Sequence, residues 1–272
     1  MIISMSSGMR SLAGRRALVT GASGGLGRAI AERLSEEGAT VAVTGRRRDA
    51  LECLATEIAA QVVQCDLADR RDLERLLGVV EEMDVVVLNA ALPATGRLDD
   101  FTVEEIDRAL DVNLRAPLLL ARAAATAMAQ RGRGHIVFVS SLAAKTSGQA
   151  LSVYAATKLG LRGLALSLRQ DLRAAGVGVS VIYPGPISDA GMWADAGLQT
   201  PMGIRARPPK AVADAVVRAI VDNRAEADVA SPVLRVAALF AQLRPTWFAA
   251  FGRHAGADEY ATAMTAAGRA KR

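Results

Sequence analysis

The segment "VTGASGGLGRAI", residues 19–30, joins a β-branched run to a helical pattern and decides the fold. Its Gly21, Gly25 and Gly27 stand where the helix should begin. At this spacing the missing side chains let backbone approach a pyrophosphate, and the amides of a helix N-terminus face that anion. In a chain with 24 glycines an ordinary strand-to-helix turn could contain the same triplet. Its position after the first predicted strand favours a dinucleotide site.

The rest of the chain alternates short apolar runs with helical patterns. The predicted strands are 16–20, 40–44, 62–66, 84–90, 135–141 and 178–184, and the predicted helices are 26–37, 51–60, 73–82, 103–130 and 154–175. Strand–helix–strand repeats imply a parallel sheet. Because the strands are apolar throughout, both faces of the sheet should be covered by helices, as in a doubly wound α/β (Rossmann) fold. Such folds bind ligands at the carboxyl ends of the strands.

The domain organisation expected from 272 residues is one α/β domain with two short additions. We predict a flexible N-terminal tail at 1–11, a dinucleotide-binding and catalytic domain at 12–230, and a C-terminal helical extension at 231–272. The extension could be a lid, a subunit interface or a membrane-surface segment. The Pro/Gly-rich stretch 184–209 is predicted to be a mobile functional loop.

Composition and charge exclude several classes of protein. No run of 18 uncharged apolar residues occurs, since Arg235 and Arg244 interrupt the nearest candidate, 229–251, so no membrane span is expected but peripheral contact is possible. The net charge of +5 comes from arginines interleaved with acids, which argues against nucleic-acid binding. Two cysteines and two histidines without ligand spacing predict no metal site. No secretory signal is evident, and we predict a cytoplasmic homodimer or homotetramer.

Three arginines follow the second predicted strand, in "VAVTGRRRD" at 41–49. Sites that prefer NAD(H) place an acid there for the ribose 2′-hydroxyl. Here Gly45 takes that position and Arg46, Arg47 and Arg48 follow, which favours the 2′-phosphate of NADP(H). Arg46 is the best single candidate, although a solvated basic loop is the alternative interpretation.

Tyr154 and Lys158, in "SVYAATKLG" at 152–160, are four residues apart and should share one helix face. A neighbouring ammonium and an oxidised nicotinamide both favour the phenolate, so we expect the pKa of Tyr154 to fall and the phenol to act as a general acid/base. Ser141 follows the fifth predicted strand and could hold a substrate oxygen, with Ser140 as its rival. Asn113 is a polar residue inside an apolar helical pattern, where a local backbone bond would also explain it.

Together "TGASGGLG", Asn89-Ala90, Asn113, Ser141 and the Tyr-x-x-x-Lys spacing resemble the short-chain dehydrogenase/reductase family over about residues 12–230. The resemblance implies that Ser141, Tyr154 and Lys158 are catalytic, and that Asn113 holds a water that relays protons to Lys158. With the glycine motif and Arg46, it implies cofactor contacts from Gly21, Ser23, Gly25, Leu26, Gly27, Arg46, Asp66, Leu67, Asn89, Ala90, Tyr154, Lys158, Pro184, Gly185, Ile187 and Ser188.

The resemblance also assigns parts of the cofactor. It places Asp66 at the adenine, Asn89 and Ala90 near the adenosine ribose, Lys158 on the nicotinamide ribose, and Ile187 and Ser188 at the carboxamide. The sequence departs from the family's Asn-Asn-Ala-Gly with Leu88-Asn89-Ala90-Ala91, which could change affinity on the ribose side.

The expected activity is NADP(H)-dependent interconversion of a hydrophobic ketone or aldehyde and its alcohol. The mostly apolar pocket candidates are Leu92, Pro93, Leu142, Gln149, Leu151, Pro186, Met192 and Trp193. The alternative is a catalytically silent NADP-binding regulatory protein on the same fold.

Overall fold

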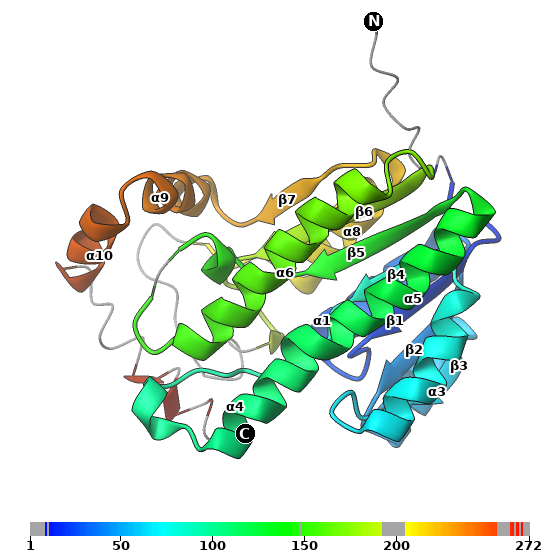
Figure 1. Ribbon diagram of the computed structural model, residues 1–272, viewed down its shortest axis with the longest axis horizontal. Helices are drawn as coiled ribbons and strands as arrows, with labels where there is room; N and C mark the ends of the chain where they lie inside the picture. Colours follow the sequence, from blue (N-terminus) through cyan, green and yellow to red (C-terminus); the bar gives the residue numbers. More distant parts are fainter. Residues whose placement is uncertain are drawn as a thin grey trace, which may run out of the picture.

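The computed structural model describes residues 9, 11–146, 148–191 and 205–254, with 262, 263, 265, 266 and 268. At its centre is a seven-stranded parallel sheet in the order β3-β2-β1-β4-β5-β6-β7 (Figure 1). The strands are β1 Arg16–Thr20, β2 Thr40–Gly45, β3 Gln61–Gln64, β4 Val85–Leu88, β5 Gly134–Val139, β6 Val177–Pro184 and β7 Glu226–Val229. The order reverses between β1 and β4, which confirms the doubly wound fold.

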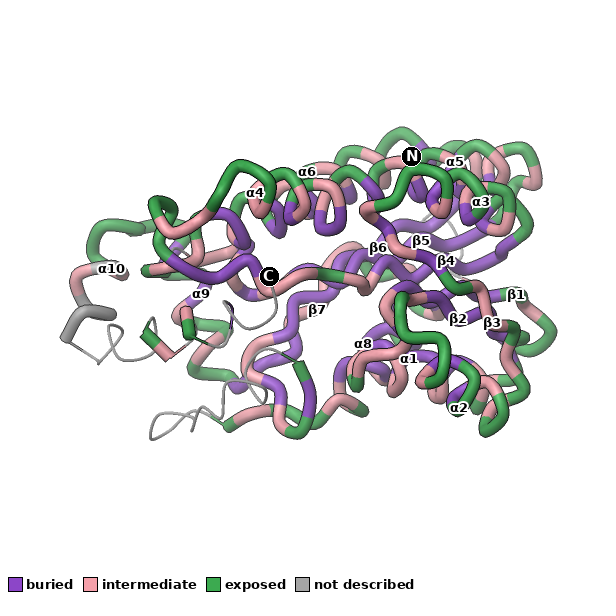
Figure 2. The backbone as a smooth tube through the Cα atoms, turned by 90° about the horizontal axis from the view of Figure 1, so that it is seen from below, coloured by how far each residue is buried: buried purple, intermediate pink, exposed green. Residues whose placement is uncertain are grey.

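Helices cover both faces of the sheet. The α-helices are α1 Gly25–Glu36, α2 Arg48–Ile58, α3 Arg70–Glu81, α4 Val103–Leu110, α5 Ala116–Arg131, α6 Ser152–Asp171, α8 Pro209–Val221, α9 Pro232–Leu243 and α10 Pro245–His254. In Figure 2, α3, α5 and α6 lie on one side of the sheet and α1, α2 and α8 on the other. The short turns η1 Leu98–Asp100, η2 Asp111–Arg115 and η3 Leu142–Ala144 complete the described elements.

Two apolar cores result from the alternation of side chains along each strand. In β1, Leu18 packs into the core beneath α3, α5 and α6, whereas Ala17 and Val19 pack into the core beneath α1, α2 and α8. All three are fully buried. The continuous apolar strands of the sequence therefore reflect burial on both faces.

The predicted helix 103–130 is wrong as one regular element. A capping box of Thr102 and Glu105 starts α4, the chain then widens into the π-helical turn η2, and α5 follows. Pro117 lies at the start of α5 and has no amide proton, so it cannot donate the regular helical bond to the carbonyl of Asn113. The interruption contains Asn113, the polar residue that stands out inside this apolar helical pattern.

The sheet has one strand more than the six predicted. β7 pairs in parallel with β6 at the sheet edge. Its sequence, EADV, contains two acids and is only partly buried, so it lacks the apolar pattern of the other strands.

The segment after β6 is anchored where it leaves and returns. The amide of Ser188 donates to the Arg207 carbonyl at 3.0 Å, and the Arg207 amide donates to the Pro186 carbonyl at 2.9 Å. Residues 192–204, which include Met192 and Trp193, lie outside the described residues. Of the helices in the described ranges, none is both long and apolar enough to cross a bilayer.

Candidate active site

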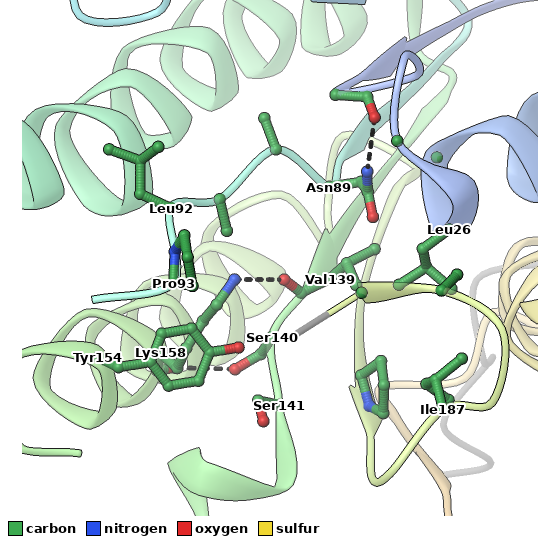
Figure 3. Close-up of a pocket in the computed structure, with 18 of the residues that line it drawn as sticks. Leu26, Asn89, Leu92, Pro93, Val139, Ser140, Ser141, Tyr154, Lys158 and Ile187 are labelled. Carbon is green, nitrogen blue, oxygen red and sulfur yellow. Dashed lines mark hydrogen bonds between the residues drawn. The ribbon is translucent and has the colours of Figure 1, made fainter. Parts of the chain in front are cut away.

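A cavity of about 960 Å³ opens at the carboxyl ends of the strands, between the β1–α1 turn and α9–α10 (Figure 3). It is lined by sixteen of the predicted site residues: Gly21, Ser23, Gly25, Leu26, Gly27, Arg46, Asp66, Leu67, Asn89, Ala90, Ser141, Tyr154, Lys158, Pro184, Gly185 and Ile187. Asn113 and Ser188 are not among the lining residues. The proton-relay role of Asn113 and the cofactor contact of Ser188 remain predictions.

The β1–α1 turn has room for a ligand only because its glycines lack side chains. Gly21 has a φ of 68°, and a Cβ there would lie 2.8 Å from the Ala90 Cα. A Cβ on Gly27 would lie 2.8 Å from the side-chain nitrogen of Asn89. Helix α1 starts after Gly24, which has no side chain to cap the first-turn amides. The turn therefore fits a pyrophosphate.

Asn89 holds this turn against β4. Its side-chain amide donates to the Thr20 carbonyl at 2.9 Å, and the amides of Asn89 and Ala90 donate to the Thr20 hydroxyl at 2.9 and 3.0 Å. Leu88, where the sequence departs from the family pattern, is buried in the core and is not a partner in these bonds.

The three arginines after β2 have different partners. Arg47 donates to the Ser23 carbonyl in the glycine turn, and Arg48 pairs with Glu52 at 2.7 Å. Arg46 lines the cavity, is exposed, and forms no ion pair with any described residue. Of the three, it is the guanidinium available to a phosphate.

Asp66 and Leu67 lie on the β3 side of the cavity. Burial alone would raise the pKa of Asp66, but the Ala68 amide and Arg108, at 3.1 Å, lower it by more. The ionised carboxylate therefore accepts hydrogen bonds from the Ala68 amide and Arg108. It lies next to the buried Leu67, at the position that the resemblance gives to the adenine.

Tyr154 and Lys158 project from one face of α6 into the cavity (Figure 3). The Lys158 ammonium lies 5.7 Å from the centre of the Tyr154 ring and donates to the Val139 carbonyl at 3.0 Å. Both residues are buried. The spacing in the sequence thus corresponds to a real pair at the strand ends.

The direction of the Tyr154 pKa shift differs from the expectation. Burial raises the pKa of Tyr154 to about 12, with the Ser141 hydroxyl acting in the opposite direction, and burial lowers the pKa of Lys158 to about 8. Removal from water disfavours the phenolate more than the hydrogen bond of Ser141 favours it. In the protein alone Tyr154 is therefore a protonated acid at neutral pH.

The two neighbouring serines take different positions. Ser140 is buried, and its hydroxyl donates to the Lys158 carbonyl of α6 at 2.9 Å. The Ser141 oxygen accepts the Ala143 amide at 3.2 Å, and its hydrogen bond is the one that lowers the pKa of Tyr154. Ser141, rather than Ser140, is therefore the serine that acts on the pKa of the phenol.

Asn113 is fully buried in η2 and bonds to one backbone segment. Its side-chain oxygen accepts the Leu92 amide at 2.6 Å, and its nitrogen donates to the Leu92 carbonyl at 2.9 Å. The side chain therefore fixes the wall of the cavity that follows β4.

The part of the cavity wall predicted for a substrate is mostly apolar. Leu92, Pro93, Leu142, Leu151 and Pro186 line it as predicted, whereas Gln149 is exposed and is not a lining residue. The sequence analysis did not single out three further wall residues, Leu234 and Ala237 of α9 and Phe248 of α10. Their only signal was the apolar pattern of 229–251, which does not say which side chains face the site.

Comparisons with known proteins agree with this geometry. Residues 15–200 match the family model of the short chain dehydrogenases. The ketoacyl reductase HetN of Nostoc sp. is 36% identical over 227 residues, which cover 80% of this chain and 79% of that protein.

Two solved structures share the fold with bound cofactors. A short-chain dehydrogenase from Sphingobium yanoikuyae in complex with NADPH has a TM-score of 0.75 and 25% identity, covering 88% of this chain and 95% of that one. A short chain dehydrogenase from Burkholderia cenocepacia in complex with NADP has a TM-score of 0.69 and 30% identity, covering 80% and 97%.

Proposed function

The chain belongs to the short-chain dehydrogenase family, and we propose that it is an NADP(H)-dependent oxidoreductase that interconverts a hydrophobic ketone or aldehyde and the corresponding alcohol. The observation that carries the proposal is the buried Tyr154–Lys158 pair, which faces the same cavity as the glycine turn. One end of that cavity suits a dinucleotide and the other suits an apolar carbonyl compound.

The residues present fit the cofactor. The glycine turn and the first-turn amides of α1 would hold the pyrophosphate, Arg46 the 2′-phosphate, and Asp66 with Leu67 the adenine. When bound, the nicotinamide supplies or accepts the hydride. The ammonium of Lys158 lies within the cavity, where it could also bind the nicotinamide ribose.

Tyr154 supplies the proton in this proposal. Its phenol stays protonated at neutral pH because burial raises its pKa to about 12. It would donate that proton to the substrate oxygen during reduction, while Ser141 holds the same oxygen. General acid catalysis of this kind contributes about 10²- to 10⁴-fold to the rate.

Lys158 favours release of the Tyr154 proton through its charge. Burial lowers its pKa to about 8, so the ammonium is still mainly protonated at neutral pH. A cation beside the phenol stabilises the phenolate that forms when the proton leaves.

Two features support NADP(H) over NAD(H) and a lipophilic substrate. Arg46 is an exposed cation directly after Gly45, which stands where an acid would bind the ribose 2′-hydroxyl. The substrate end is lined by Leu92, Leu142, Leu234 and Phe248, so polar substrates would lose hydration without regaining partners.

The deciding experiment follows NADPH oxidation by the full chain against a panel of hydrophobic ketones, aldehydes and quinones. The proposal expects turnover that Tyr154→Phe abolishes while NADPH binding, measured by fluorescence, persists. Binding of NADPH without oxidation across the whole panel would instead identify a silent regulatory protein.

A further inference from the structure

Helices α9 and α10 present one side to the cavity and leave the other uncovered. Val233, Val236, Leu239, Leu243 and Trp247 are 61–76% exposed, and Phe240 is 45% exposed. The inner side is different: Ala238 and Ala241 are buried, and Leu234, Ala237 and Phe248 line the cavity. These exposed residues recur every three or four positions, so they form one apolar stripe along α9 that continues to Trp247.

The stripe lies at one end of the molecule. Figure 1 shows α9 and α10 beyond the carboxyl ends of the strands, and α9 is joined to α6 by a hydrogen bond from Arg162 to Gln242 at 2.9 Å. The same two helices form part of the wall of the substrate cavity. An apolar surface that covers this end would therefore be separated from the cavity by a single layer of helix.

The charges around the stripe indicate which kind of partner fits. Between Asp228 and Asp258 the sequence has no acidic residue, but it has Arg235, Arg244 and Arg253. Arg235 and Arg244 are exposed, and among the described residues neither forms an ion pair. A second copy packed on this stripe about a two-fold axis would bring these cations together, and α9 and α10 of either copy supply no acid to compensate them.

An anionic lipid surface fits both properties of the stripe. Exposed Leu, Phe and Trp side chains on a helix, flanked by arginine, are typical of helices that lie in the plane of a membrane interface. We propose that the outer side of α9 and α10 docks on an anionic bilayer, and that the inner side admits a lipophilic substrate from that bilayer to the cavity. The second part rests on the proposed function, whereas docking does not.

The test is flotation of the full chain with two kinds of vesicle. One is phosphatidylcholine, and the other contains roughly one-third phosphatidylglycerol. We expect the chain to bind the anionic vesicles and to lose most of that binding in high salt, because each cation at such a surface contributes about five-fold. Absence of binding to the anionic vesicles would overturn the proposal, as would equal binding to both kinds.

The variant Val236→Asp with Leu243→Asp places two acids on the stripe. We expect it to bind anionic vesicles at least about ten-fold more weakly, because charged side chains enter an apolar interface poorly. Val103→Asp is the matched control, since Val103 is 68% exposed at the first turn of α4, where an acid is stabilising. Equal binding by the double variant and the control would overturn the assignment of the surface.

Two further readouts keep the result interpretable. Trp247 fluorescence should shift to the blue on anionic vesicles, and Trp247→Phe should remove that shift. Size-exclusion chromatography of the wild type and the double variant tests whether a second copy of the chain covers the stripe instead. A wild-type dimer that the double variant no longer forms would show self-association through the stripe and contradict membrane docking.

Failure of docking can be distinguished from failure of the proposed function. Oxidation of NADPH with a water-soluble ketone in the absence of vesicles should be the same, within a factor of about two, in the wild type and the double variant, because exposed surface substitutions have small effects. No oxidation by the wild type would contradict the proposed function and leave vesicle binding as an independent result.

Discussion

The half of the cavity proposed to hold the cofactor and the half proposed to hold the substrate, called the cofactor half and the substrate half, are built in different ways. The cofactor half consists of strand ends and backbone, with Gly21, Gly27 and Asn89 in close contact across β1 and β4. The substrate half is closed by side chains of α9 and α10, which lie beyond the sheet. The first is determined by local packing that tolerates few residues, and the second by apolar surfaces that many residues could form. Specificity should therefore vary more readily in the substrate half.

The largest effect should come from Tyr154, where the two halves meet. Tyr154→Phe removes the acidic proton and keeps the ring in its apolar cluster with Ala94, Ala109 and Val153. We expect kcat to fall by about 10²- to 10⁴-fold with NADPH affinity unchanged. Steady-state kinetics and a fluorescence titration check the two quantities. A Phe variant with the wild-type kcat would remove Tyr154 from the mechanism.

The cofactor half can be tested through Arg46. Arg46→Ala should reduce the preference for NADPH over NADH by about 10- to 100-fold, since charge-assisted hydrogen bonds contribute about 1.5–3 kcal/mol. The measurement is kcat/KM with each cofactor. Arg48→Ala is the control, because Arg48 already pairs with Glu52 and should leave the ratio unchanged. A wild type that prefers NADH would contradict the role given to Arg46.

The substrate half can be tested with two adjacent aromatic residues. Phe248 lines the cavity, whereas Trp247 is 72% exposed. Phe248→Ala should raise the KM for a hydrophobic ketone by about ten-fold without changing that for NADPH, because a lost apolar contact costs about 1–3 kcal/mol. Trp247→Ala, assayed without vesicles, should leave both KM values alone. Equal effects of the two variants would place α10 elsewhere relative to the substrate.

The smallest effect concerns pH. Burial lowers the pKa of Lys158 to about 8, so its ammonium is lost as the pH rises through that value. The rate of carbonyl reduction should therefore fall several-fold between pH 7 and pH 9, since the cation no longer stabilises the forming phenolate. In Lys158→Arg, whose guanidinium stays charged, the decline near pH 8 should disappear. If the arginine variant, while active, showed the same decline, another group would be titrating.

The cofactor half follows local rules that can be read from the sequence, and the substrate half does not. The apolar strands and the glycine turn were predictable because each satisfies a local rule, burial on both faces or backbone approach. The edge strand β7 was not, since a half-exposed EADV carries no such pattern. The inner and outer sides of α9 could not be told apart in advance, because both are apolar.

The direction of the Tyr154 pKa shift was also beyond the sequence. Spacing placed an ammonium near the phenol, but the direction of the shift is set mainly by how completely the phenol leaves water. Likewise the polar Asn113 was visible as an anomaly, but its two bonds to Leu92 required knowledge of which loop lies beside η2.

The widened turn η2 has a consequence for how α4 and α5 are connected. A π-helical turn holds one residue more than a regular one, and each residue of an α-helix turns the chain by about 100°. Deleting one residue between Leu110 and Ala116 would thus rotate α4 relative to α5 and carry Ala109 out of its contact with the cluster around Tyr154. The length of this short turn, and not only the identity of its residues, therefore keeps Tyr154 buried.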